Sequence, residues 1–393
     1  MRQKVLFNRL KSLEAWQNKL KMTMKVYDVK TGKEIDKKIE ELKFCGKQGK
    51  IEGHHMLSEI FEQTETIKKA AQQEDGKLIE AAMEILRAKN VIFVACGTAR
   101  HASIIGRYAL SKVARKFADV VMAHEFQYFM ESVNDSTLII AVSQSGETAD
   151  VLEGVKEAKR RGAKLISVTN VPTSSLARIS NIVFDIHAGP EVAVASTKAF
   201  TGQVAVLYML AYAARNKIQE AELNLEAIAS RIPEILAENE SVIKELAETL
   251  KEKEHFYYLA RGIDFAIASE GALKLKEITY IHAEGMPAGE LKHGTLSLIE
   301  KGTPIVVICP KDYTFEETLN NAREAKARGA YIIGVSDEKK DLFDVWIKIP
   351  KVEEIFYPLV SVIPLQLFAY YMAVARCKNP DKPRNLAKSV TVK

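Results

Sequence analysis

Short apolar runs alternate with longer amphipathic stretches over most of the chain. VIFVA at 91–95, TLIIAV at 137–142 and KLISVT at 164–169 are bounded by Gly, Ser, Thr or Asn, and stretches with a helical period separate them. Fully buried parallel strands that helices cover on both faces give this pattern. The expected fold class is therefore α/β, with a doubly wound parallel sheet.

The pattern occurs twice. EAKRRGAKLISVTN at 157–170 aligns without a gap on EAKARGAYIIGVSD at 324–337, with eight identities. Each copy reads as an amphipathic helix, a terminal Gly and a β-branched strand. The likeness continues upstream, where TLIIAVSQSGETADVLEG matches TPIVVICPKDYTFEETLNN after one inserted residue. We therefore expect two tandem copies of one α/β domain.

The repeat divides the chain into six expected segments. A short strand pair around Thr31-Gly32 follows a basic N-terminal helix, and Ile218–Leu250, rich in Glu, Ala, Leu and Ile, has the composition of a helical connector. The segments are the N-terminal helix and strand pair at 1–45, a linking helix at 46–80, the first domain at 81–217, the connector at 218–250, the second domain at 251–375 and an irregular tail at 376–393.

Composition excludes several classes of protein. The net charge of +5 in 393 residues is spread without basic blocks, so we expect no nucleic-acid partner. The four cysteines show no CxxC spacing, which predicts neither a zinc cage nor a disulfide framework and favours a reducing cytoplasm. Ile355–Ala375 is uncharged and long enough to cross a membrane, but it contains Pro358, Pro364 and Gln366. We expect a buried core helix there and no membrane association.

One strand end carries a concentration of hydrogen-bond donors. Ser143, Gln144, Ser145 and Thr148 follow the strand TLIIAV, and Gly146 lets the backbone turn closely around a ligand. A helix begins at the same point, so free backbone N–H groups and its dipole favour an anion, most simply a phosphate. The loop has no lysine, so it is not a nucleotide P-loop. The alternative is that these side chains only cap the helix.

Two further segments favour a ligand pocket over a cap. Cys96-Gly97-Thr98-Ala99 follows the first strand of the same copy, and Val194–Lys198 adds hydroxyls after the turn Gly189-Pro190. Strand ends of an open α/β sheet meet at one edge, where such sheets bind ligands. The second copy has CPKDYT in place of SQSGET. We therefore expect the pocket, for a polyhydroxylated phosphate, in the first copy.

Candidate reactive groups lie in the second copy and the tail. Lys274 and Glu277 share a helix face, although this spacing also suits a surface ion pair. His293 stands in a glycine-flanked turn, where a titrating imidazole could reach a ligand, although a lone histidine is more often inert. Lys388 lies in a tail without a periodic core face.

Together these segments resemble one family, the isomerase half of glutamine–fructose-6-phosphate aminotransferase (glucosamine-6-phosphate synthase), which is built from two sugar isomerase (SIS) domains. The resemblance covers about residues 50–393, and its last segment is absent from SIS proteins in general. The matching segments are CGT at 96–98, SQSGETADV at 143–151, GPEVAVASTKAFT at 189–201, EGALKLKEITYIHAEG at 270–285, AGELKHG at 288–294 and DKPRNLAKSVTV at 381–392.

The resemblance implies a role for each candidate. Lys388 would form a Schiff base with C2 of fructose 6-phosphate, Glu277 would move a proton between C1 and C2, and Lys274 would assist near C1. His293 would open the sugar ring from a neighbouring subunit. The implied substrate-binding residues are Ser143, Gln144, Ser145 and Thr148 at the phosphate, Thr98, Val194 and Ser196 at the sugar hydroxyls, and the positions of Ala99 and Ala387.

Two positions depart from the family pattern: Ala99 stands where many members carry a ligand-contacting serine, and Thr295 replaces a frequent proline. The resemblance further implies a homodimer with shared active sites, fructose 6-phosphate and glucosamine 6-phosphate as ligands, and neither cofactor nor metal.

Ammonia would come from a glutaminase domain or a separate subunit, because no glutaminase cysteine follows Met1. A fragment, a processed product and a protein with a separate glutaminase all remain open. The alternative functions are an SIS deglycase or isomerase of another phosphosugar and a sugar-phosphate-binding regulatory module.

Overall fold

A computed structural model describes residues 26–27, 34–35 and 53–391. The chain divides into two compact units, Met1–Ile51 and Glu52–Lys393. In the first unit, β1 (Val26–Tyr27) pairs antiparallel with β2 (Glu34–Ile35), where the sequence predicts two short strands. The predicted N-terminal helix and the first residues of the predicted linking helix lie outside the described residues.

The second unit contains two parallel sheets of five strands each. Their strand orders are β4-β3-β5-β6-β7 and β9-β8-β10-β11-β12, so the second sheet repeats the topology of the first. This confirms the α/β class and the doubly wound duplication. The strands are β3 (Asn90–Ala95), β4 (Asp119–Met122), β5 (Thr137–Val142), β6 (Lys164–Thr169), β7 (Ile182–Asp185), β8 (His255–Ala260), β9 (His282–Pro287), β10 (Pro304–Ile308), β11 (Tyr331–Ser336) and β12 (Val345–Lys348).

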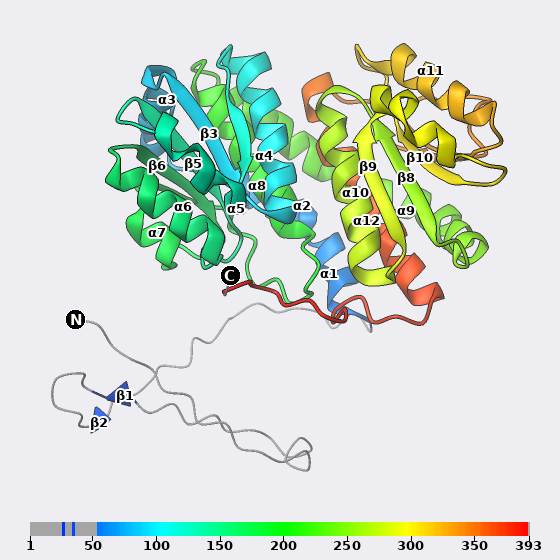
Figure 1. Ribbon diagram of the computed structural model, residues 1–393, viewed down its shortest axis with the longest axis horizontal. Helices are drawn as coiled ribbons and strands as arrows, with labels where there is room; N and C mark the ends of the chain where they lie inside the picture. Colours follow the sequence, from blue (N-terminus) through cyan, green and yellow to red (C-terminus); the bar gives the residue numbers. More distant parts are fainter. Residues whose placement is uncertain (1–25, 28–33, 36–52, 392–393) are drawn as a thin grey trace. The chain divides into compact units, whose positions relative to one another are not determined.

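Helices cover both faces of each sheet (Figure 1). The α-helices are α1 (His55–Phe61), α2 (Gln63–Ala71), α3 (Asp75–Arg87), α4 (Gly97–Ala109), α5 (Ala123–Phe126), α6 (Ala149–Arg160), α7 (Ser175–Ile179), α8 (Lys198–Ala213), α9 (Ile218–Leu250), α10 (Phe265–Thr279), α11 (Phe315–Lys326) and α12 (Tyr357–Ala375). Short helical turns are η2 (Leu110–Ala114), η3 (Gln127–Ser132), η4 (Gly262–Asp264), η5 (Ala288–His293), η6 (Thr295–Leu298) and η7 (Glu354–Phe356).

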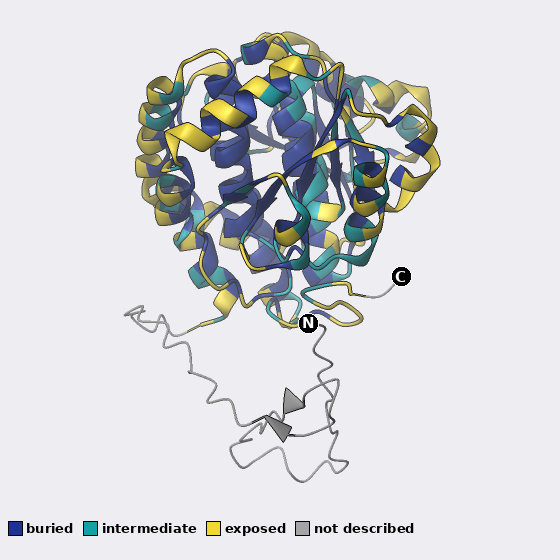
Figure 2. Ribbon diagram, turned by 90° about the vertical axis from the view of Figure 1, so that its left-hand side faces the viewer, coloured by how far each residue is buried: buried dark blue, intermediate teal, exposed yellow. Residues whose placement is uncertain are grey.

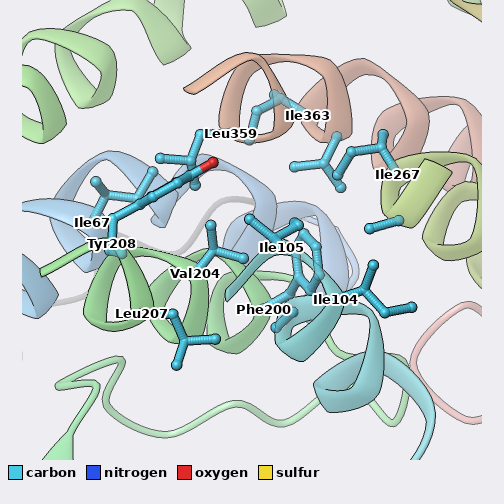
Figure 3. Packing of buried hydrophobic residues seen from close by; sticks show 14 of the residues in the cluster. Ile67, Ile104, Ile105, Phe200, Val204, Leu207, Tyr208, Ile267, Leu359 and Ile363 are labelled. Atoms are coloured by element: carbon cyan, nitrogen blue, oxygen red, sulfur yellow. The ribbon is translucent and has the colours of Figure 1, made fainter. Parts of the chain in front are cut away.

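The two sheet domains share one hydrophobic core (Figure 3). Ile105 of α4 and Val204 of α8 come from the first domain, and Ile267 of α10 and Ile363 of α12 come from the second; all four side chains are fully buried. Figure 2 shows buried helix ribbons in the interior, whereas helices at the periphery carry exposed positions. The domains therefore meet through packed helices.

Helix α12 contains the uncharged stretch that the sequence assigns to the core. Among the described residues, Glu354–Ala375 is long and apolar enough to cross a membrane, with a mean hydropathy of 1.6 in its most apolar window. However, 83% of that window is buried inside the protein, and the helix packs against α9 and α10. The interpretation as a core helix is confirmed.

The described part of the segment predicted as one linking helix at 46–80 differs from that prediction. Three helices, α1, α2 and α3, occupy it, and α3 runs on to Arg87. The break follows from Gln72, whose ψ of 69° leaves the helical region and ends α2. Because of this break, α2 and α3 can both lie against α8 from different directions. Helix α9 spans Ile218–Leu250, the range predicted for the connector.

Candidate functional site

A polar pocket opens at the carboxyl ends of β3 and β5. In the strand order of this sheet, β4 lies on one side of β3 and β5 on the other, so the chain leaves the two neighbouring strands toward different faces. Ligands bind at such a switch point in open α/β sheets. The pocket has a volume of about 130 Å³ and is lined by Cys96, Thr98, Ala99, Val142, Ser143, Gln144, Ser145, Thr148, Val151, Ser196, Gln203 and Lys388.

The loop after β5 is pre-formed by its own hydroxyl groups. Ser143 Oγ lies 3.2 Å from Thr148 Oγ1 and accepts the backbone N–H of Gly146 at 3.2 Å. Gly146 has a φ of +64°, and a Cβ at this position would lie 2.1 Å from Ser174 Oγ. Only glycine allows this close turn. The loop leads directly into α6, so the positive end of that helix faces the pocket.

The C-terminal tail brings Lys388 into the pocket wall. Lys388 Nζ lies 2.5 Å from Glu191 Oε2 and donates to the carbonyl of Ala193 at 2.8 Å. The Glu191 side chain is fully buried and also accepts the backbone N–H groups of Thr197 at 2.9 Å and Ala199 at 3.0 Å. The amine of Lys388 is thus held at the pocket by one buried carboxylate.

Further hydrogen bonds fix the tail along the first domain. Ser389 Oγ donates to Ser145 Oγ at 3.1 Å, and Ala149 N–H donates to the carbonyl of Val390 at 3.2 Å. Both contacts directly follow Lys388 in the chain and end on the loop after β5 or the first turn of α6. The tail therefore lies against the loop, and both contribute to the lining of one site.

A buried ionic cluster on α10 reaches the same pocket through Thr98. Lys274 Nζ is 2.6 Å from Glu277 Oε2 and 3.4 Å from Glu270 Oε1, and it donates to Thr98 Oγ1 at 3.0 Å. Although burial lowers the pKa of Lys274, the carboxylates of Glu270 and Glu277 outweigh it and raise that pKa above its usual value. Lys274 is therefore cationic and fixed in place, while Glu277 keeps some contact with solvent.

The structure brings together most of the predicted site residues. Lys274 and Glu277 join the pocket through Thr98, whereas Val194 donates its N–H to the carbonyl of Asp381 and does not line the pocket. His293 is exposed at the end of η5, and neither it nor Ala387 lines the pocket. Those that do line it are Thr98, Ala99, Ser143, Gln144, Ser145, Thr148, Ser196 and Lys388.

The sequence motifs did not identify several residues of the site. Glu191 and Glu270 both lie inside the quoted motifs, and Glu270 stands four residues before Lys274, a spacing that places them on one helix face. His101 Nδ1 lies 2.7 Å from Glu270 Oε2 across the domain boundary. Gln203 lines the pocket from α8. The motif positions of the two glutamates could have indicated them, but nothing in the sequence pairs His101 with Glu270.

Comparison with known proteins agrees with the duplicated fold. The family model described as "SIS domain" matches residues 84–213 and 249–376. A relative from Thermococcus kodakarensis, named glutamine–fructose-6-phosphate aminotransferase [isomerizing], is 45% identical over 93% of this chain and 62% of its own length. A relative of the same name from Pyrococcus horikoshii is 40% identical over 93% of this chain and 63% of its own length.

A solved structure covers the same part of the chain. The C-terminal domain of glucosamine-fructose-6-phosphate aminotransferase from Francisella tularensis superimposes with a TM-score of 0.78 at 36% identity. The match covers 86% of this chain and the whole of that one. This chain spans less than two thirds of the length of the two archaeal relatives, and it matches all of the solved C-terminal domain.

Proposed function

We propose that this chain converts fructose 6-phosphate to glucosamine 6-phosphate when ammonia is supplied. The chain belongs to the SIS domain family, in the branch of the C-terminal domain of glucosamine-fructose-6-phosphate aminotransferase. The observation that carries the proposal is the position of Lys388. Its amine lies in the wall of the pocket that the donor-rich loop at Ser143–Thr148 forms. A pocket for phosphate alone would not require an amine that can bond covalently to a ketose.

The loop after β5 binds the phosphate in this proposal. Hydroxyl groups of Ser143, Ser145 and Thr148 and the N-terminus of α6 supply donors without a fixed cation. Gln144 lines the same pocket and joins these donors at the phosphate, while Ser196 and Thr98 bond the sugar hydroxyls. The family resemblance alone assigns Val194 and Ala387 to the sugar, since neither lines the pocket. Ala99 has no hydroxyl, so its contribution is limited to the backbone.

Covalent chemistry begins at Lys388. The amine attacks the C2 carbonyl of the open-chain ketose, water leaves, and a protonated imine forms. Before the attack, the ammonium group must lose a proton to solvent, and Glu191 at 2.5 Å holds the amine in position. Ammonia then replaces the lysine amine at C2, which frees Lys388 and leaves the nitrogen on the sugar.

Proton transfer completes the isomerisation. Glu277 removes a proton from C1, a proton is returned to C2, and the C1 hydroxyl becomes the aldehyde of the aldose. Lys274, cationic and 2.6 Å from Glu277, stabilises negative charge that develops near C1. We assign ring opening to His293 of a second subunit, because in this chain His293 is exposed and does not line the pocket.

The proposal includes partners beyond this chain. A homodimer would place His293 at the neighbouring pocket, and the ammonia would come from a glutaminase domain or a separate subunit. A cytoplasmic location suits a phosphosugar substrate. These assignments rest on the family resemblance and on the position of His293, which in this chain does not line the pocket.

Incubation with fructose 6-phosphate, with and without ammonium, tests the activity. We expect glucosamine 6-phosphate with ammonium and slow formation of glucose 6-phosphate without it, because the proton shuttle does not need the nitrogen. Borohydride should trap the sugar on Lys388. Lys388→Arg keeps the charge but lacks the nucleophile and should lower turnover at least about 1,000-fold. Lys382→Arg, an exposed tail lysine outside the pocket, is the matched control.

The same assay separates the alternatives. A phosphosugar deglycase or isomerase of another substrate would leave fructose 6-phosphate and ammonium unconverted. A regulatory module would bind the sugar phosphate without turnover and would not lose function in Lys388→Arg. Full turnover in that variant would disprove the covalent step.

A further inference from the structure

Three metal-binding side chains converge beside the pocket. Cys96 follows β3, His124 lies in α5 directly after β4, and Asp150 stands in the first turn of α6. One ligand atom from each lies within 4.8 Å of the others, and Cys96 Sγ is 4.0 Å from His124 Nδ1. The adjacent strands β4 and β3, together with α6, which follows β5, bring these side chains to one edge of the sheet.

The chemistry of the three donors selects the ion. A thiolate, an imidazole and a carboxylate together suit Zn²⁺ better than Mg²⁺ or Ca²⁺, which prefer oxygen ligands alone. The thiolate and the carboxylate carry two negative charges, which match a divalent cation. A thiol that coordinates a metal loses its proton, so the neutral cysteine of the free protein is no obstacle.

The sulfur and the imidazole nitrogen lie near the separation that zinc requires. Tetrahedral zinc with bonds of about 2.3 Å to sulfur and about 2.0 Å to nitrogen holds those ligand atoms roughly 3.5 Å apart. Cys96 Sγ and His124 Nδ1 therefore need to approach each other by about half an ångström. The His124 side chain is half exposed, so it can rotate without disturbing the core.

Space for a further ligand lies next to the cluster. A hollow of about 10 Å³ is bordered by His124 and Asp150, together with Ala123, Gln127, Glu153 and Gly154. This volume is close to the minimum for one water molecule. Three protein ligands and one water give the coordination of an open zinc site.

We propose that Cys96, His124 and Asp150 bind a thiolate-preferring divalent cation, Zn²⁺, at the rim of the pocket. Cys96 lines both the metal site and the pocket, and Asp150 lies two residues after Thr148. A bound ion ties the end of β3 and α5 to the helix that presents the donor-rich loop. The site is independent of the proposed catalytic chemistry, because none of its three ligands acts in that chemistry.

Metal binding can be measured on the full chain without substrate. Titration of metal-free protein with Co²⁺ should give about one equivalent bound, with the absorption of a cobalt–thiolate bond, and Zn²⁺ should displace it. Cys96→Ser should abolish this absorption. His124→Ala should weaken Zn²⁺ binding at least about 10-fold. Cys377→Ser, an exposed cysteine outside the cluster, should leave both signals unchanged.

A second measurement does not depend on the thiolate. Zn²⁺ should raise the melting temperature of the wild type, because it binds the folded state, and should not raise it in His124→Ala. Equal Zn²⁺ affinity in the wild type, Cys96→Ser and His124→Ala would overturn the site, as would a cobalt–thiolate absorption that disappears in Cys377→Ser. Since no step uses a sugar phosphate, failure here leaves the proposed function untouched, and loss of that function leaves this site intact.

Discussion

Two carboxyl groups near Lys388 have pKa values that shift in opposite directions. Burial and the charge of Glu191 raise the pKa of Glu59 to about 7. Burial alone would also raise the pKa of Glu191, but the charge of Lys388 and the N–H groups of Ala199 and Thr197 outweigh it and hold that pKa below its usual value. Glu191 therefore stays ionised as the partner of Lys388, while Glu59 exchanges a proton near neutral pH.

The raised pKa of Glu59 predicts that the free energy of unfolding depends on pH. Its pKa is raised in the folded state, so the folded state holds the proton more tightly, and stability falls as pH rises from about 4.5 to about 7. The loss amounts to as much as about 3 kcal/mol. Glu59→Gln mimics the protonated acid because the amide oxygen of glutamine can take the place of Glu59 Oε1. That oxygen can accept the same N–H groups of Val192 and Ala193. This variant should lose that pH dependence.

Urea unfolding at several pH values measures this effect. The control is Glu65→Gln, an exposed glutamate on the neighbouring helix α2, which should keep the pH dependence of the wild type. Identical slopes in Glu59→Gln and the wild type would contradict the assignment.

A side chain at Gly146 should destabilise the fold by a steric clash as well as by backbone strain. Gly189, which has a similar φ, is the control for the strain alone. Gly146→Ala and Gly189→Ala both introduce a side chain at a φ near +65°, which costs about 1 kcal/mol or more in each. Only at Gly146 does the new Cβ meet another residue, 2.1 Å from Ser174 Oγ, whereas nothing lies within 4 Å at Gly189. Gly146→Ala should therefore cost about 1–3 kcal/mol more.

The free energies of unfolding of the two glycine variants, measured under the same conditions, check this difference. Gly146→Ala should also weaken binding of fructose 6-phosphate, because the turn of the donor-rich loop must widen. Equal stability of the two variants would show that Ser174 does not restrict the turn.

At the scale of elements, the C-terminal tail is held by individual hydrogen bonds rather than by a periodic hydrophobic face. Asp381 accepts the N–H groups of His55 at 2.9 Å and Met56 at 2.8 Å, at the first turn of α1. Arg384 lies over the ring of Tyr280, 4.2 Å from its centroid. The tail thus connects the linking segment and the second domain before it reaches the pocket.

Asp381→Ala should release this connection. Loss of two bonds to a helix start costs about 1 kcal/mol of stability, and the looser tail should lower turnover because Lys388 is less well positioned. Unfolding by urea and the ammonium-dependent assay measure the two effects. Asp341→Ala, an exposed loop residue, should change stability by less than about 0.5 kcal/mol and leave turnover unchanged. Unaltered turnover in Asp381→Ala would show that other contacts position Lys388.

Several strands could be predicted because their runs are mostly apolar. TLIIAV and KLISVT coincide with β5 and β6, and VIFVA falls within β3. The tail contacts could not be predicted, since hydrogen bonds between single side chains and distant backbone groups leave no periodic pattern. The same holds for Thr98 and Lys274, whose contact depends on how α4 packs against α10.

The metal ligands also show where sequence spacing gives too little information. A search for CxxC finds only ligands that are neighbours in the chain, whereas Cys96, His124 and Asp150 are brought together by three strand ends. The prediction of no metal rested on cysteine spacing and on the family resemblance, and neither compares these three residues. Sheet topology had to be known before these residues could be compared.

At the scale of the whole molecule, the shared core couples the two sheet domains. Ile104 of α4, Phe200 of α8 and Ile267 of α10 lie in the same cluster, and all are buried (Figure 3). The hydrogen bonds of Glu270 with Thr98 and His101 cross the same boundary. Neither domain can separate from the other without exposing apolar surface and a buried charge.

Ile267→Ala should therefore destabilise both domains together, by about 2–5 kcal/mol, through the cavity that it leaves. Fluorescence of Trp346 reports the second domain in a Trp16→Phe background, and circular dichroism reports the whole chain. We expect the two urea transitions to coincide. Val242→Ala, on an exposed position of α9, should shift neither by more than about 0.5 kcal/mol. A separate, earlier transition of Trp346 would refute the coupling.

The contact between α4 and α10 also limits how this architecture can be recombined. A chimaera that takes its first sheet domain from one relative and its second from another would inherit mismatched side chains along these helices. It would also risk a glutamate without its histidine. A working chimaera should require that α4 and α10 are exchanged together as a matched pair. The two sheet domains should therefore evolve together, although each repeats the topology of the other.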